Sequence, residues 1–95
     1  MTERERAVAL RIEGRVQGVW YRGWMVVEAE RRGLRGWVRN RRDGSVEALL
    51  MGQDALVAEM IEACRRGPPA ARVSAVIERP VADDGSLGFR QRPTE

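Results

Sequence analysis

Apolar and polar residues alternate along short stretches of the chain, a pattern typical of half-buried strands. In the first stretch, Val8, Leu10 and Ile12 fall on one face, while Arg11 and Glu13 fall on the other. The predicted strands cover residues 7–13, 34–40, 45–51, 72–78 and a short final segment at 87–90. An Asp-Gly pair between the second and third strands predicts a tight hairpin turn.

Two longer stretches carry apolar residues at helical spacing. The first, predicted over 22–32, is followed by Gly33, a residue suited to end a helix. The second, predicted over 55–66, follows Asp54, which is a favourable N-cap residue. Its apolar stripe consists of Val57, Met60, Ile61 and Cys64. Both patterns therefore predict amphipathic helices packed on a sheet.

The resulting order is β-α-β-β-α-β plus a short terminal strand. This order predicts a ferredoxin-like split βαβ sandwich of the α+β class, with an antiparallel sheet and both helices on one face. A length of 95 residues fits a single domain over 1–95. We expect its core to span 7–91, with frayed ends at 1–6 and 92–95.

Composition narrows the class of protein. Hydrophobic residues make up 43% and charged residues 33%, which is typical of a soluble globular domain. No apolar run is long enough to span a membrane, and no signal peptide is recognisable, so we expect a cytoplasmic protein without a membrane partner. The net charge is +3, but all 17 basic residues are arginine. The presence of an arginine is therefore weak evidence, and its position has to carry the inference.

A glycine-bracketed loop joins the first strand to the first helix. Gly14 and Gly18 allow the backbone to curl, and Arg22 lies at the expected first turn of the helix. Inward-pointing N–H groups, the helix N-terminus and a guanidinium together suit a phosphoryl group. The alternative is an ordinary turn between strand and helix.

Several chemistries lack their usual residues. The chain has no histidine, and Cys64 falls on an apolar stripe, where a core role is expected. A reaction at the loop would therefore depend on positioning and charge stabilisation, as phosphoryl transfer does. Asn40, at the end of the second predicted strand, is a candidate for holding a water or a substrate oxygen. It is equally an ordinary turn-initiating residue.

Two segments resemble the signatures of a known family. Residues 14–22 (GRVQGVWYR) resemble the first acylphosphatase signature, and residues 36–40 (GWVRN) resemble the second. Residues 67–73 (GPPAARV) are similar to a later segment of that family. The resemblance covers about residues 7–79. Two signatures at the right separation are more specific than either alone.

The resemblance implies hydrolysis of a small acyl phosphate to a carboxylate and inorganic phosphate, without a metal or cofactor. It assigns phosphate binding and catalysis to Arg22, and the orientation of the attacking water to Asn40. Main-chain N–H groups would form the phosphate cradle, and they belong to Arg15, Val16, Gln17, Gly18 and Val19. A monomer is expected, and a nucleic-acid partner is not.

Other readings stay open beside this one. An anion-binding or RNA-binding ferredoxin-like module without turnover is the alternative function, since sheets of this kind also bind RNA. Trp20 and Trp24 lie close to the loop, where they would pack in the core or at its rim, or form an apolar wall for the acyl group. Arg41 and Gly23 depart from residues common in the family, which bears on rate and stability.

Overall fold

A computed structural model of the chain describes residues 4–95 and contains two helices and five strands. The elements are β1 (Glu5–Arg15), α1 (Tyr21–Arg31), β2 (Arg35–Asn40), β3 (Val46–Gln53), α2 (Asp54–Arg66), β4 (Arg72–Pro80) and β5 (Phe89–Gln91). Every predicted helix and strand is present, with ends that differ by a few residues. Among the described residues, neither helix has the length and apolar character needed to cross a membrane.

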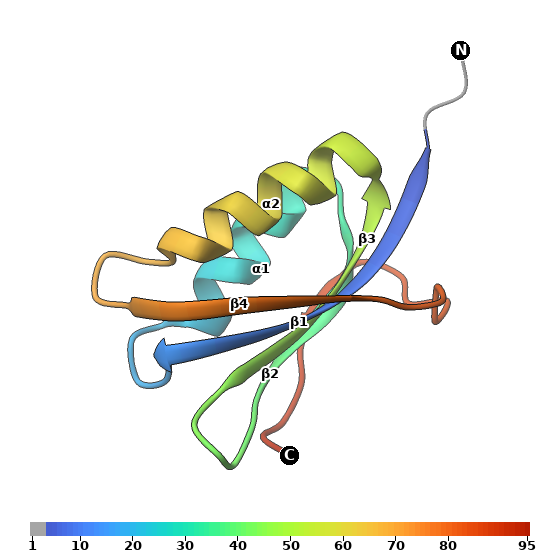
Figure 1. Ribbon diagram of the computed structural model, residues 1–95. Coiled ribbons are helices and arrows are strands. Elements are labelled where there is room, and N and C mark those ends of the chain that lie inside the picture. The colour runs from blue at the N-terminus through green and yellow to red at the C-terminus, as the bar shows by residue number, and fades with distance from the viewer. Residues whose placement is uncertain (1–3) are drawn as a thin grey trace.

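The five strands form one sheet in the order β4-β1-β3-β2-β5. Strand β1 pairs antiparallel with both β3 and β4, and β2 pairs antiparallel with β3. Both helices lie on the same face of this sheet (Figure 1). The predicted ferredoxin-like fold class is confirmed.

The terminal strand makes the sheet mixed, where an antiparallel sheet was expected. Strand β5 pairs with β2 in parallel, with Gly36 opposite Phe89 and Val38 opposite Gln91. The reason is topological: β4 ends at the end of the sheet where β2 begins. The chain then crosses to the far edge and runs in the direction of β2 (Figure 1).

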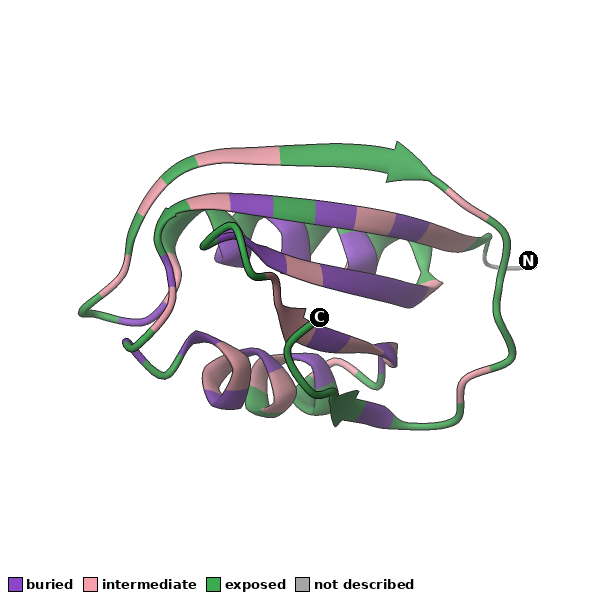
Figure 2. Ribbon diagram, turned by 90° about the horizontal axis from the view of Figure 1, so that it is seen from below, coloured by how far each residue is buried: buried purple, intermediate pink, exposed green. Residues whose placement is uncertain are grey.

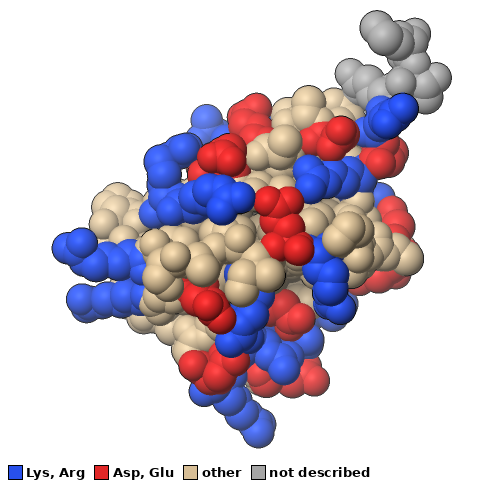
Figure 3. Space-filling model, viewed as in Figure 1, with Lys and Arg blue, Asp and Glu red and all other residues tan. Residues whose placement is uncertain are grey.

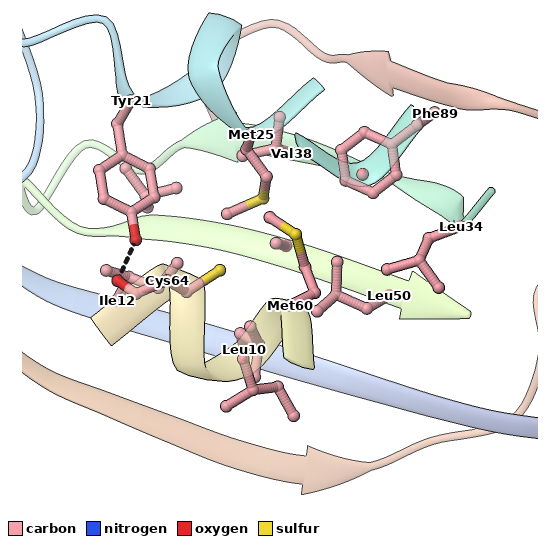
Figure 4. Close-up of a cluster of buried hydrophobic side chains, with 14 of the residues drawn as sticks. Leu10, Ile12, Tyr21, Met25, Leu34, Val38, Leu50, Met60, Cys64 and Phe89 are labelled. Atoms are coloured by element: carbon pink, nitrogen blue, oxygen red, sulfur yellow. Dashed lines mark hydrogen bonds between the residues drawn. The ribbon is translucent and has the colours of Figure 1, made fainter. Parts of the chain in front are cut away.

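The core lies between the sheet and the two helices. Buried and more exposed residues alternate along β1 and β2 (Figure 2), and Val8, Leu10 and Ile12 are all buried as their spacing predicts. From the helices, Met25 and Met60 point into the same cluster (Figure 4). Burial of these faces supplies the main stabilising free energy and fixes the ends of β1, α1 and β2.

The predicted end of α1 at Gly33 is confirmed, whereas the predicted N-cap of α2 at Asp54 is wrong. Gly33 has the left-handed φ of 66° that suits a C′ residue, and its N–H donates to the Glu30 carbonyl. Asp54 is not an N-cap: Gln53 takes that place, without a side-chain cap. Asp54 is instead the first residue of the helix, and its N–H donates to the Arg4 carbonyl beside the start of β1.

Strand pairing and backbone hydrogen bonds extend into both segments that were expected to fray. Strand β1 begins at Glu5, within the segment 1–6 that was expected to fray; residues 1–3 lie outside the described part. The tail 92–95 was expected to fray as well, but it follows the edge of β2. The Arg92 N–H donates to the Val38 carbonyl at 2.8 Å, and the Glu95 N–H donates to the Asn40 carbonyl at 3.1 Å. Free carbonyls on the edge of β2 explain this pairing.

Candidate active site

The loop between β1 and α1 is anchored by its apolar side chains. Val16 and Val19 are buried in the core, whereas Gly18 between them is exposed. The backbone takes left-handed φ values at Gly18 (73°) and at Trp20 (64°). Such conformations let successive N–H groups converge on one side, as in anion-binding nests.

Four backbone N–H groups of this loop lack an acceptor in the part of the chain that the structure describes. Within residues 4–95, no hydrogen-bond acceptor is present for the N–H of Val16, Gln17, Gly18 or Val19. Helix α1 follows directly, with no side-chain cap and no acidic residue in its first turn. Free donors and the positive end of a helix dipole therefore meet at one place, and an anion satisfies both.

Gly14 sets the start of the loop. It lies at a bulge in the pairing of β1 with β4, with a φ of 122°. A Cβ at this position would lie 2.2 Å from the carbonyl oxygen of Arg72. Only glycine permits this close approach, and the approach fixes where the loop leaves the sheet.

Arg22 differs from the other arginines in its surroundings. Ion pairs engage eight arginines: Arg6, Arg11, Arg31, Arg32, Arg35, Arg39, Arg41 and Arg65. Basic and acidic side chains are correspondingly interspersed on the face shown in Figure 3. Arg22 is the one partly buried arginine without an ion pair among residues 4–95. Its guanidinium is therefore available to an external anion.

Asn40 is contributed to the site by strand β2. It is the last residue of β2 and pairs with Val46 of β3, so its backbone is fixed. Its side-chain amide has no hydrogen-bond partner among the described residues. A partly buried, unpartnered amide at the edge of a pocket is suited to hold a water.

One pocket of about 140 Å³ brings these groups together. Its lining residues are Val16, Gln17, Gly18, Trp20, Tyr21, Arg22, Gly23, Asn40 and Gln91. The lining contains one cation and no carboxylate, thiol or imidazole. The pocket is thus equipped to bind a negative group, and it offers no side chain for covalent attack by sulfur or for proton transfer by a carboxylate or a histidine.

Two residues predicted for the cradle lie outside this lining. Arg15 ends β1 opposite Arg72 of β4, and the Val19 side chain is buried in the core. Conversely, Gln91 lines the pocket although it was not predicted. It comes from β5, whose pairing with β2 had no signal in the sequence.

Gln17 ties the loop to the hairpin that carries Asn40. Its Nε2 donates to the carbonyl of Arg41 at 2.7 Å and to that of Ser45 at 2.8 Å. The Arg41 side chain pairs with Glu47 at 3.3 Å and does not line the pocket. The charged residue after Asn40 therefore leaves the pocket unobstructed.

The hairpin turn is held by Asp43. Its carboxylate accepts hydrogen bonds from the hydroxyl of Ser45 at 2.6 Å and from the backbone N–H of Ser45 at 2.9 Å. These bonds, with a further one from Arg11, hold the pKa of Asp43 well below its usual range. The carboxylate is thus ionised at neutral pH, and the turn next to Asn40 stays fixed.

The start of α1 is fixed from the core side. The Tyr21 hydroxyl donates to the carbonyl of Cys64 in α2 (Figure 4). Burial raises the pKa of the Cys64 thiol to about 12, so the thiol is neutral, and the expected core role of Cys64 is confirmed. With Tyr21 held inside, the next residue, Arg22, is directed to the pocket.

Comparisons with a family model and with known proteins indicate the same family. The acylphosphatase family model matches residues 8–91. An acylphosphatase from Rhodospirillum rubrum is 54% identical over 89 residues, covering 94% of this chain and 98% of the relative. One from Rhodopseudomonas palustris is 59% identical over 80 residues, covering 84% of this chain and 80% of the relative.

Solved structures agree with the sequence relatives. The structure of an acylphosphatase from Coxiella burnetii superimposes with a TM-score of 0.89 at 33% identity, over 93% of each chain. That of an acylphosphatase from Bacillus subtilis gives a TM-score of 0.88 at 33% identity, over 90% of this chain and 97% of the other. This chain belongs to the acylphosphatase family.

Proposed function

We propose that the pocket between the β1–α1 loop and the end of β2 is where this chain carries out the acylphosphatase reaction. That reaction is the hydrolysis of the carboxyl–phosphate bond of a small acyl phosphate to a carboxylate and inorganic phosphate. The observation that carries the proposal is the convergence on one pocket of loop N–H groups, the Arg22 guanidinium and the Asn40 amide, none of which has a partner among residues 4–95.

The phosphoryl group binds in the loop. The N–H groups of Val16, Gln17 and Gly18 donate to its oxygens, and the Arg22 guanidinium supplies a planar pair of donors and a positive charge. The N–H groups of Arg15 and Val19 complete the cradle in this proposal. Since these donors are held in place by β1 and the core, they stabilise the developing charge without reorganising.

Asn40 positions the water. Its side-chain amide holds the attacking water in line with the phosphorus and the leaving carboxylate oxygen. The leaving carboxylate is a weak base, with a conjugate-acid pKa of about 4, so it departs without a general acid. The water's proton passes to a phosphate oxygen. In this scheme the chain needs neither a metal nor another cofactor.

The RNA-binding alternative is not favoured. Sheets that bind RNA stack bases on exposed aromatic rings. Trp37 lies on β2, but the guanidinium groups of Arg39 and Arg92 each lie 4.7 Å from the centroid of its ring. The ring is therefore already occupied by cation–π contacts and does not offer a free stacking surface.

A phosphate titration followed by amide NMR tests the proposed cradle. We expect inorganic phosphate to shift the backbone N–H resonances of 16–19 and the guanidinium resonance of Arg22, and to leave those of α2 unchanged. Shifts scattered over the exposed arginines instead would place the anion elsewhere and contradict the assignment.

We also propose that the 10.7 kDa chain is a monomer, and the rotational correlation time of the same sample tests this.

A cytoplasmic location belongs to the same proposal. The single Cys64 is free and buried, which is compatible with a reducing compartment. Cell fractionation tests it, and recovery of the chain in an extracytoplasmic fraction would contradict it.

A further inference from the structure

Trp20 is a large aromatic residue displayed at the mouth of the pocket. The residue is 67% exposed, and it lines the same pocket as Arg22 and Asn40. The other apolar residues in that lining, Val16 and Tyr21, are buried. Among the described residues, Trp20 is thus the one exposed apolar side chain that the pocket presents to a ligand.

The backbone at Trp20 has an unusual conformation for a residue with a side chain. Trp20 is the one non-glycine residue with a positive φ among residues 4–95, at 64°. A residue with a Cβ adopts this conformation at a cost in free energy. The neighbouring Trp24 behaves differently: it is partly buried and packs edge-to-face on Tyr21, with ring centroids 5.2 Å apart. Trp24 therefore packs against the core, whereas Trp20 is largely exposed.

Gly23 explains how the ring is held. A Cβ on Gly23 would lie 2.1 Å from Nε1 and 2.4 Å from Cε2 of Trp20, so the indole lies directly against the helix backbone. Nε1 makes no hydrogen bond to the described residues, so the missing side chain of Gly23 determines where the ring rests. The five-membered ring of the indole thus lies against the helix at Gly23, and the 67% exposure of Trp20 leaves much of the side chain open to solvent.

We propose that the indole of Trp20, seated on Gly23, is a binding platform for the acyl part of the substrate and favours aromatic acyl phosphates over acetyl phosphate. This inference rests on the proposed function. With the phosphoryl group enclosed by the loop donors, the acyl group extends from the bridging oxygen toward the mouth of the pocket. When a planar apolar acyl group stacks on the open indole surface, both surfaces are removed from water, and this burial favours binding.

The test compares benzoyl phosphate with acetyl phosphate on purified protein. In Trp20→Ala we expect kcat/KM for benzoyl phosphate to fall about tenfold, which corresponds to about 1.4 kcal/mol. We expect the value for acetyl phosphate, and the inhibition constant of inorganic phosphate, to change by less than about twofold. Leu87→Ala is the matched control, since Leu87 is 78% exposed and does not line this pocket.

Gly23→Ala supplies a second test that keeps the indole. Gly23 has a helical backbone and alanine favours helices, so the variant folds, and its added Cβ displaces the ring. We expect a selective loss with benzoyl phosphate, in the same direction as in Trp20→Ala. Equal losses with both substrates, or no loss, would overturn the platform while leaving the proposed function intact. Absence of turnover of either substrate by the wild-type chain would overturn the proposed function itself.

Discussion

Replacing Arg22 by glutamine is expected to lower kcat/KM for acyl phosphates by about 10²–10³-fold, by analogy with the loss of one oxyanion donor. Glutamine keeps an N–H donor on a shorter side chain and removes the charge and the planar fork. Arg22 is partly buried and has no ion pair among residues 4–95, so its charge is available to the substrate. Steady-state kinetics with a generic acyl phosphate measure the effect, and the inhibition constant of inorganic phosphate is expected to rise in parallel.

The stability of this variant separates a functional role from a structural one. Because Arg22 contacts no charged partner among the described residues, we expect the free energy of unfolding to change by less than about 0.5 kcal/mol. Arg79→Gln is the matched control: Arg79 is exposed, lies on β4 and is also without an ion pair in the described chain. Full activity of Arg22→Gln, or an equal loss in Arg79→Gln, would remove Arg22 from the site.

Replacing Asn40 by alanine is expected to lower kcat by about 10²–10³-fold while KM and phosphate inhibition change little. The reason is that Asn40 is assigned to the water and not to the phosphoryl group. Alanine keeps the backbone pairing with Val46 and the carbonyl that accepts the Glu95 N–H, so the strand persists. Separate determination of kcat and KM, with the urea unfolding midpoint as a check on folding, measures the effect.

A loss of phosphate affinity in Asn40→Ala would contradict the assignment of Asn40 to the water and of Arg22 to the phosphoryl group. If Asn40→Ala raised the inhibition constant of phosphate as strongly as Arg22→Gln, Asn40 would belong to the cradle. Asn40→Asp is the informative companion, because it keeps the shape and one oxygen acceptor but adds a negative charge beside the phosphoryl group. We expect it to weaken phosphate binding through repulsion, which Asn40→Ala does not.

Much of the fold follows from local patterns in the chain. The alternation of Val8, Leu10 and Ile12 predicts β1 and its buried face, and Gly33 ends α1 where expected. The direction of β5 was not predictable, because three residues carry too little pattern to select an edge. The order of the tail at Glu95 depends on a long-range pairing with β2, which no local signal encodes.

Some features of the candidate site were also predictable from the sequence, and others were not. The motifs predict Arg22 and Asn40 as site residues, and both line one pocket in the structure. That Arg22 has no ion pair in the described part of the chain could not be predicted from a sequence with so many arginines, since it depends on which carboxylates lie nearby in space. The link from Gln17 to the hairpin and the seat of Trp20 on Gly23 likewise depend on atoms brought together by folding.

Turnover of an acyl phosphate by the wild-type chain in the presence of EDTA tests the central claim most directly. We predict equimolar release of carboxylate and inorganic phosphate at an undiminished rate, with inorganic phosphate acting as a competitive inhibitor. A folded preparation, shown by a cooperative unfolding transition, that releases no phosphate would contradict the account. So would turnover that EDTA abolishes and a divalent cation restores.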